Sequence, residues 1–240
     1  MSTLYHFGDS YSLTFPNPNI KHFGKHIANT IGFEYHPAGV SGNSNEQILN
    51  IIIKYLTHFQ SGDIVFVNFS FISRGSWYNN KKNQVESTNR FNDRAFWEKR
   101  FSKSEDENNK VISLINYYLE YTEDYVSRVF TLINSTLSYI ESSGISIFYI
   151  FIDDAPYLEG LIKVGTNIKF KNGFHIWLRD NGFHGEEEGH YTFGIQQMLS
   201  NVILKKTNNL NINTGKSVDI SIDDVDLNLI IEKDKLSFLI

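Results

Sequence analysis

The sequence contains no cysteine among its 240 residues. Disulfide bonds, catalytic thiols and cysteine-ligated zinc are therefore excluded. No apolar run approaches the roughly 18 residues that a membrane-spanning helix needs. The N-terminus also lacks the basic stretch followed by an apolar one that marks a secretory signal peptide. We therefore expect a soluble protein with no membrane span, cytoplasmic or without a recognisable export signal.

An excess of positive charge is also missing. The chain carries 22 Lys and Arg against 27 Asp and Glu, which gives a formal net charge of −5 at pH 7. Nucleic-acid-binding domains usually present a strongly basic surface, so no nucleic-acid partner is expected. Hydrophobic residues make up 41% of the chain and aromatic residues 15%, which is enough for a sizeable core. The composition leaves the oligomeric state open.

Strand and helix patterns alternate along the chain. Strands are expected at 4–8, 33–38, 63–69 and 145–152, with shorter strand-like pieces within 161–178, and helices at 20–31, 46–59, 111–141 and 189–206. This alternation is typical of a three-layer α/β/α fold with a parallel central sheet. Ligands of such folds bind beyond the carboxyl ends of the strands.

Two segments depart from this alternation. Residues 70–109 are polar and irregular, and we expect them to form a partly helical insertion or lid within a domain spanning 1–207. Residues 208–240 alternate between apolar and polar residues, with Asp and Lys turns between the runs. They are expected to form a small antiparallel C-terminal β appendage.

The first strand runs directly into Gly8-Asp9-Ser10. These residue types also commonly end a strand without any chemical role. A serine nucleophile needs a histidine base, a group that orients the base, and donors for the oxyanion. Among the eight histidines, His184 stands out because it follows a turn-like stretch and precedes a helical one. His6 lies inside the first strand and is expected to be a packed or paired core residue.

Three stretches together resemble the SGNH, or GDSL, hydrolase family. FGDSYS at 7–12 resembles the first family block, AGVSGNS at 38–44 the second, and HGEEEGH at 184–190 the start of the last helix. The resemblance covers about residues 4–206 and implies the flavodoxin-like SGNH hydrolase fold. It implies Ser10 as nucleophile and His184 as base. It also implies the backbone N–H groups of Ser10 and Gly42 as oxyanion donors, with Gly39 as the alternative to Gly42.

The sequence departs from the family pattern in two places. The third family block, Gly-x-Asn-Asp, is absent, and Asn68 is the nearest asparagine that could complete the oxyanion hole, with Ser70 and Ser73 as alternates. The usual Asp-x-x-His spacing places Asn181 rather than an aspartate at the position that orients the histidine. We favour Asp180 as the triad acid, because one extra loop residue would bring it into place, and keep Asn181 as the alternate.

The resemblance implies a serine esterase that hydrolyses small acyl esters, such as O-acetyl groups on a carbohydrate, without a cofactor. Two alternatives stay open. The two departures favour a catalytically weak or silent domain that binds a glycan or a protein partner. The other alternative keeps the chemistry and is an O-acyltransferase. The cluster at 184–190 also invites a metal interpretation. Its two histidines are six residues apart, however, and the helical zinc motif requires four, so no metal is expected.

Overall fold

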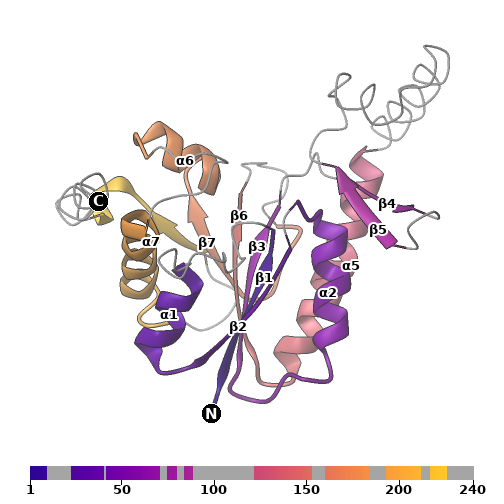
Figure 1. Cartoon of the computed structure of the whole chain (residues 1–240), viewed down its shortest axis with the longest axis horizontal. Helices are drawn as coiled ribbons and strands as arrows, with labels where there is room; N and C mark the ends of the chain where they lie inside the picture. Colours follow the sequence, from indigo (N-terminus) through magenta and orange to yellow (C-terminus); the bar gives the residue numbers. More distant parts are fainter. Residues whose placement is uncertain are drawn as a thin grey trace.

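The computed structural model describes residues 1–9, 23–40, 42–70, 75–79, 84–88, 122–152, 160–183, 193–211 and 217–225. Six strands in this part of the chain form one sheet in the order β2-β1-β3-β6-β7-β8. They are β1 (Thr3–Gly8), β2 (Glu34–Gly39), β3 (Ile64–Phe69), β6 (Ser146–Phe151), β7 (Thr166–Phe170) and β8 (Ser217–Ile220). Every neighbouring pair in this sheet is parallel. The strands therefore end at one common edge, which lies at the top of Figure 1.

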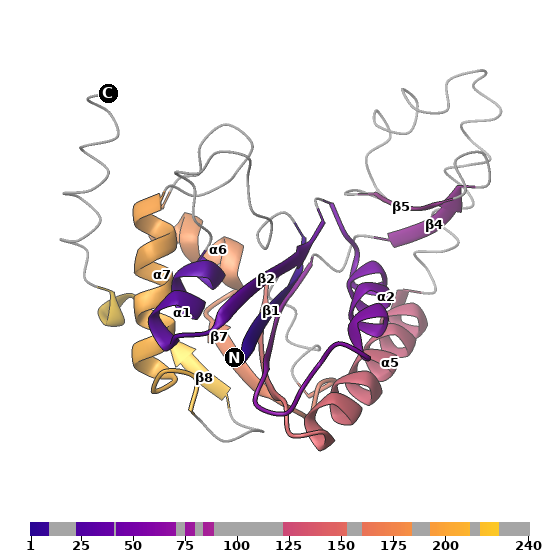
Figure 2. The ribbon, with the colours of Figure 1, turned by 60° about the horizontal axis from the view of Figure 1, so that its bottom comes forward.

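Helices cover both faces of the sheet (Figures 1 and 2). On one side lie α1 (Phe23–Ile31), α6 (Phe174–Asp180) and α7 (Phe193–Lys206), and on the other α2 (Asn45–Tyr55) and α5 (Thr122–Ser142). A short 3₁₀ helix, η3 (Ile222–Asp224), follows β8. The architecture is a three-layer α/β/α fold. None of the helices in the described ranges is long and apolar enough to cross a membrane.

The central strands are apolar on both faces, because each face packs against helices. In β1, Leu4 joins the core beneath α1 and α7, whereas Tyr5 and Phe7 join the core beneath α2 and α5. The same alternation holds in β3, where Phe66 belongs to the first core and Val67 to the second. This alternation fixes which face of the sheet each polar side chain of these strands can occupy.

The strand order reverses at β1. The chain passes from β1 to its neighbour β2 on one side and then returns to β3 on the other side. In doubly wound sheets the crevice beyond the carboxyl ends of the strands at this reversal is the usual ligand site. Gly8 ends β1 and Phe69 ends β3, so the segments that follow these two residues begin at that crevice.

The expected strands of the sheet and its covering helices are confirmed within the described ranges, with differences outside the central strands. The first residues of the helices expected at 20–31, 111–141 and 189–206 lie outside those ranges. The insertion at 70–109 contains an antiparallel strand pair, β4 (Gly75–Asn79) and β5 (Gln84–Thr88), where helix was expected in part. Apart from Ser70, the remainder of that insertion lies outside the described residues. The strand-like region at 161–178 holds β7 but continues into α6, because Phe174, Trp177 and Leu178 are spaced to bury one helical face in the core.

The C-terminal region also differs from the expected appendage. β8 pairs in parallel with β7, from Asn167 opposite Ser217 to Phe170 opposite Ile220. Ile220 packs into the same core as α1 and α7. An alternating pattern of apolar and polar residues is the same in a parallel edge strand and in an antiparallel hairpin strand. The sequence therefore favoured a separate β unit, whereas in the structure β8 extends the main sheet. Residues 226–240 lie outside the described residues.

Candidate active site

The end of β1 is joined to the loop that follows β2. Gly8 pairs with Gly39 across the two strands. The carbonyl oxygen of Gly8 accepts hydrogen bonds from the backbone N–H of Val40 and from Nδ2 of Asn43, both at 3.2 Å. The N–H of Asn43 also donates to the carbonyl of Val40 at 3.2 Å, and Gly42 has φ = 75°. A turn with positive φ at its third residue favours glycine there, so Gly42 suits its place beside the first strand.

This loop leads directly into α2. Ser44 is the N-cap, and its hydroxyl accepts a hydrogen bond from the N–H of Gln47 at 3.3 Å. The side chain of Gln47 in turn accepts from the N–H of Ser44 at 3.4 Å. This reciprocal capping box stabilises the first turn of the helix. The helix therefore begins at the carboxyl edge of the sheet, with Asn45 as its first residue.

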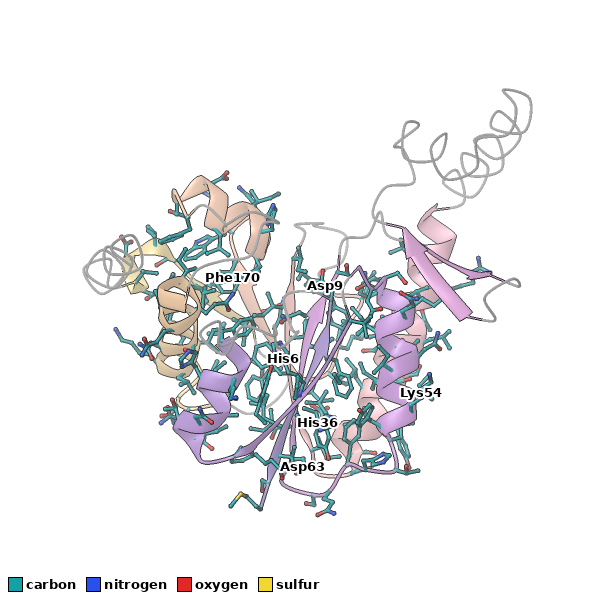
Figure 3. The ribbon with its side chains drawn as sticks, in the orientation of Figure 1. His6, Asp9, His36, Lys54, Asp63 and Phe170 are labelled. Carbon is teal, nitrogen blue, oxygen red and sulfur yellow. The ribbon has the colours of Figure 1, made fainter. Side chains whose placement is uncertain are left out.

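Asn45 holds the residue that follows β3. Its Oδ1 accepts from the backbone N–H of Ser70 at 2.7 Å, and its Nδ2 donates to the backbone carbonyl of Ser70 at 3.0 Å. The hydroxyl of Ser70 donates to Oδ2 of Asp9 at 3.4 Å. All three side chains are buried. Figure 3 shows Asp9 at the upper end of the sheet, above His6.

Asn68 lies inside β3, opposite Ile150 of β6. Its side chain is 1% exposed, and neither its Nδ2 nor its Oδ1 has a hydrogen-bond partner among the described residues. Side chains alternate between the two faces of a strand, so Asn68 lies on the same face as Phe66. Phe7 of β1 pairs with Val67 of β3, so Asn68, the next residue of β3, lies beside Gly8. Leaving a buried amide without partners costs about 1–3 kcal/mol, so an asparagine at this position calls for an explanation beyond packing.

His6 is a paired core residue, as the sequence indicated. Its Nδ1 lies 3.1 Å from the hydroxyl of Tyr35, and its ring packs edge-on against Phe23 and Phe66. Burial raises the pKa of Tyr35 above its ordinary value. The tyrosine therefore stays neutral at physiological pH. Because its partners are Tyr35, Phe23 and Phe66, His6 belongs to the core rather than to the candidate site.

The two candidates for the residue that orients His184 lie at the end of α6. Asp180 is the last residue of that helix, and Asn181 follows it with its Nδ2 donating to the carbonyl of Trp177 at 2.7 Å. β3 and β6 stand between β7, from which α6 continues, and β1. The structure thus brings Asp9, the Gly42 turn and Ser70 together at the β1–β3 edge, but it places Asp180 and Asn181 beyond it. Ser10, Ser73 and His184 lie outside the described residues, as does the 184–190 cluster.

A separate pocket of about 560 Å³ opens beside Asp180 and Asn181. It is lined by Lys169, Lys171, Asn172, Trp177, Asp180, Asn181, Asp219, Ile220, Ser221 and Ile222. Lys169 stands opposite Asp219 in the β7–β8 register, so charges of both signs meet there. The indole of Trp177 packs between Phe170 and Phe183, with ring centroids 5.1 and 5.9 Å away. The contact with Phe183 is stacked and the contact with Phe170 is edge-on, and Trp177 is only 4% exposed, so little of the indole is available for stacking on a sugar.

Sequence reasoning named Asp9 and Asn43 only as parts of the two motifs, with no role of their own, and did not name Asn45. All three are buried polar residues that bond to the ends of β1 or β3. The usable signal was the run Gly-Asn-Ser-Asn-Glu-Gln at 42–47, in which two asparagines flank a serine N-cap. Asparagine beside a helix start tends to bond to nearby backbone groups. Here, however, Asn45 bonds to Ser70, 25 residues away, and Asn43 bonds to Gly8, 35 residues away.

Comparison with known proteins gives no family assignment. No family model matches the chain, and no curated protein matches it. The chain is similar in structure to a protein from Desulfitobacterium hafniense DCB-2, described as belonging to the G-D-S-L family with a proposed lipolytic role. Their identity is 9% and the TM-score 0.35, over 94% of this chain and 83% of that one.

A second similar structure is the Bacillus subtilis protein YxiM. Its identity to this chain is 11% and the TM-score 0.37, over 91% of this chain and 43% of that one. The present chain therefore matches less than half the length of that protein. At these values the assignment of the fold rests on the strand pairing described above.

Proposed function

We propose that this chain is a serine esterase that hydrolyses small acyl esters at the carboxyl edge of β1 and β3. The observation that carries the proposal is the placement of Gly8-Asp9 at the reversal of strand order, with the Gly42 turn bonded to the Gly8 carbonyl. Ser10 follows Asp9 directly in the chain. The proposed nucleophile therefore directly follows a residue at the edge of the sheet where doubly wound folds bind their ligands.

In the proposed reaction, Ser10 Oγ attacks the ester carbonyl carbon and His184 Nε2 takes the hydroxyl proton. The tetrahedral intermediate collapses, the carbon–oxygen bond to the alcohol breaks, and His184 returns the proton to the leaving oxygen. A water molecule then attacks the acyl-enzyme with His184 again as base, releasing the acid and regenerating the serine. The resemblance of the sequence motifs to the SGNH hydrolase family suggests a small acyl ester, such as an O-acetyl group on a carbohydrate, as the substrate.

Asn68 is the best candidate for the third oxyanion donor, beside the N–H groups of Ser10 and Gly42. Its Nδ2 has no other partner among the described residues, and it lies beside Gly8 on β3. The hydroxyl of Ser70, the first alternate, already donates to Asp9. A donor held in a buried, water-poor position stabilises a developing oxyanion more effectively than one in water.

Asp180 is the better candidate for the group that orients His184. Asn181 is a neutral amide, and its Nδ2 donates to the carbonyl of Trp177 at the end of α6. Only a carboxylate would also stabilise the imidazolium that forms during catalysis. The four-residue separation between Asp180 and His184 allows them to approach each other within one loop.

Hydrolysis of chromogenic acetyl, butyryl and octanoyl esters tests this function, together with acetate release from acetylated oligosaccharides. We expect the acetyl ester to be the best substrate, and Ser10→Ala and His184→Ala each to abolish turnover. Asp180→Asn should reduce kcat far more than Asn181→Ala, which serves as its matched control. Absence of Ser10-dependent ester hydrolysis across the whole series would contradict the proposal. Faster decay of the acyl-enzyme with added alcohol than with water would instead identify an acyltransferase.

A further inference from the structure

We propose that Asn45 and Ser70 are positioning residues that fix the carboxylate of Asp9, and through it the point from which the chain continues to Ser10. This inference rests on the function proposed above and names the side chains that orient its nucleophile. Asn45 is the first residue of α2, Ser70 follows the last residue of β3, and Asp9 follows the last residue of β1. These three elements meet at one edge of the sheet.

The contact between Asn45 and Ser70 works in both directions. One amide group accepts from the N–H and donates to the carbonyl of the same residue, at 2.7 and 3.0 Å. A neighbouring β-strand would offer Ser70 the same pair of bonds. The asparagine side chain therefore continues the pairing of β3 by one residue and leaves the Ser70 backbone little freedom.

The fixed backbone directs the Ser70 hydroxyl at Asp9. The Oγ to Oδ2 distance is 3.4 Å, and Asp9 is fully buried. Asp9 is bonded covalently to Ser10 and follows Gly8, whose carbonyl is held by Val40 and Asn43. The segment before the nucleophile is therefore held on one side through the Gly8 carbonyl and on the other through the Asp9 carboxylate.

The support for this arrangement is rigid. α2 is anchored to the sheet by Ile48, Leu49 and Ile52, which are buried in the core shared with Phe7 and Phe69. Asn45 cannot follow Ser70 if the segment after β3 shifts, because the helix start is fixed by its capping box. Catalytic groups held by such packed elements keep their geometry, and a misplacement of about 1 Å can cost about 100-fold in rate.

A purely structural role would be to join α2 to β3 without affecting the nucleophile. Substitutions at position 70 separate the two roles. Ser70→Ala keeps both backbone bonds to Asn45 and removes only the hydroxyl that reaches Asp9. Ser70→Thr restores a hydroxyl at the same carbon. Asn45→Ala removes the support from the Ser70 backbone itself.

The absence of cysteine from the chain provides a reporter that does not depend on esterase activity. In a Ser10→Cys variant the introduced thiol is the only one in the protein. Iodoacetamide alkylates the thiolate, so the rate of alkylation measured against pH gives the midpoint at which this thiol loses its proton, and nearby charges shift that midpoint. Ser142→Cys, on an exposed position of α5, provides a control thiol far along the chain. Each reporter is combined with Ser70→Ala, Ser70→Thr and Asn45→Ala, and folding of every variant is checked by circular dichroism.

We expect Ser70→Ala and Asn45→Ala to raise the pH midpoint for alkylation of the Ser10→Cys thiol by about half a unit or more, because a released Asp9 carboxylate disfavours a neighbouring thiolate. Ser70→Thr should restore the midpoint, and the Ser142→Cys control should not move. With Ser10 intact, Ser70→Ala should slow labelling by a fluorophosphonate about tenfold. An unchanged midpoint in folded Ser70→Ala and Asn45→Ala proteins would overturn the positioning role.

The two hypotheses fail in different ways. If wild-type Ser10 does not react with the fluorophosphonate, the proposed esterase function fails, and the thiol midpoints still decide whether Asn45 and Ser70 position residue 10. If wild-type Ser10 reacts but the midpoints do not move in the Ser70 and Asn45 variants, the esterase stands and the positioning role is wrong.

Discussion

The side chain of Gln196 accepts a hydrogen bond from the backbone N–H of Phe23 at 3.1 Å. Phe23 is the first residue of α1 and Gln196 lies in α7, 173 positions later in the chain. A helix leaves its first N–H groups without partners inside the helix. Here a buried side chain from the last described helix satisfies one of them, and it ties together the helices that follow the Ser10 and His184 segments.

Replacing Gln196 with alanine is expected to destabilise the fold by about 1–3 kcal/mol, because the buried N–H of Phe23 would be left unpaired. Gln197→Ala provides the matched control, since its side chain is only partly buried at the neighbouring position. Urea denaturation of both variants measures the difference. Equal losses of stability in the two variants would show that the bond to Phe23 contributes nothing specific.

A second prediction concerns Gly24, which faces His6. A Cβ added to Gly24 would overlap Nδ1 and the adjoining ring atoms of His6. Gly24→Ala should therefore cost about 1–3 kcal/mol or more through overpacking. In a His6→Ala background, which removes the ring, the same Gly24→Ala change should cost much less, so a double-mutant cycle should show strong coupling. Additive losses would contradict the close approach.

High pH provides a third prediction, centred on Tyr149. Burial raises the pKa of Tyr149 to about 12, above its ordinary value of 10.0. The folded state therefore keeps a proton that the unfolded state releases, so this contribution is complete below pH 10 and is lost as pH rises toward 12. Between these values the free energy of unfolding should fall more steeply for wild type than for Tyr149→Phe, by up to about 1.4 kcal/mol per pH unit. Parallel slopes in denaturant titrations would refute this assignment.

Asn68 should show opposite effects on stability and reactivity. Its amide has no hydrogen-bond partner among the described residues, so replacing it with an apolar side chain of similar size, as in Asn68→Leu, should leave the protein equally stable or more stable. The same change should reduce labelling of Ser10 by a fluorophosphonate by about 10²–10³, the usual effect of losing one oxyanion donor. Thermal unfolding and labelling kinetics measure the two effects. Wild-type labelling by this variant would remove Asn68 from the oxyanion hole.

Much of the fold could be predicted from the chain because its central strands are short apolar runs between helical patterns. β3 and β6 are buried on both faces, and apart from Asn68 and Ser146 their sequences are apolar runs. β8 could not be placed in this way. Its alternating pattern fits any edge strand, and only its pairing with β7 and the burial of Ile220 show which sheet it joins.

The candidate site could be predicted only in part. Turn chemistry located Gly8-Asp9 and the Gly42 loop, since both follow strands directly. The bonds between Asn45, Ser70 and Asp9 could not be foreseen, because they depend on how closely α2 approaches the ends of β1 and β3. Local sequence patterns record residue spacing along an element and carry little information about contacts between elements.

The central claim is that Ser10 is an activated nucleophile, and intact mass after treatment with a fluorophosphonate measures this most directly. The reagent forms a stable covalent adduct with a serine that a neighbouring base activates. We predict one adduct on the wild-type protein, none on Ser10→Ala and almost none on His184→Ala. A wild-type protein that acquires no adduct, or a Ser10→Ala protein that acquires the same one, would contradict the account.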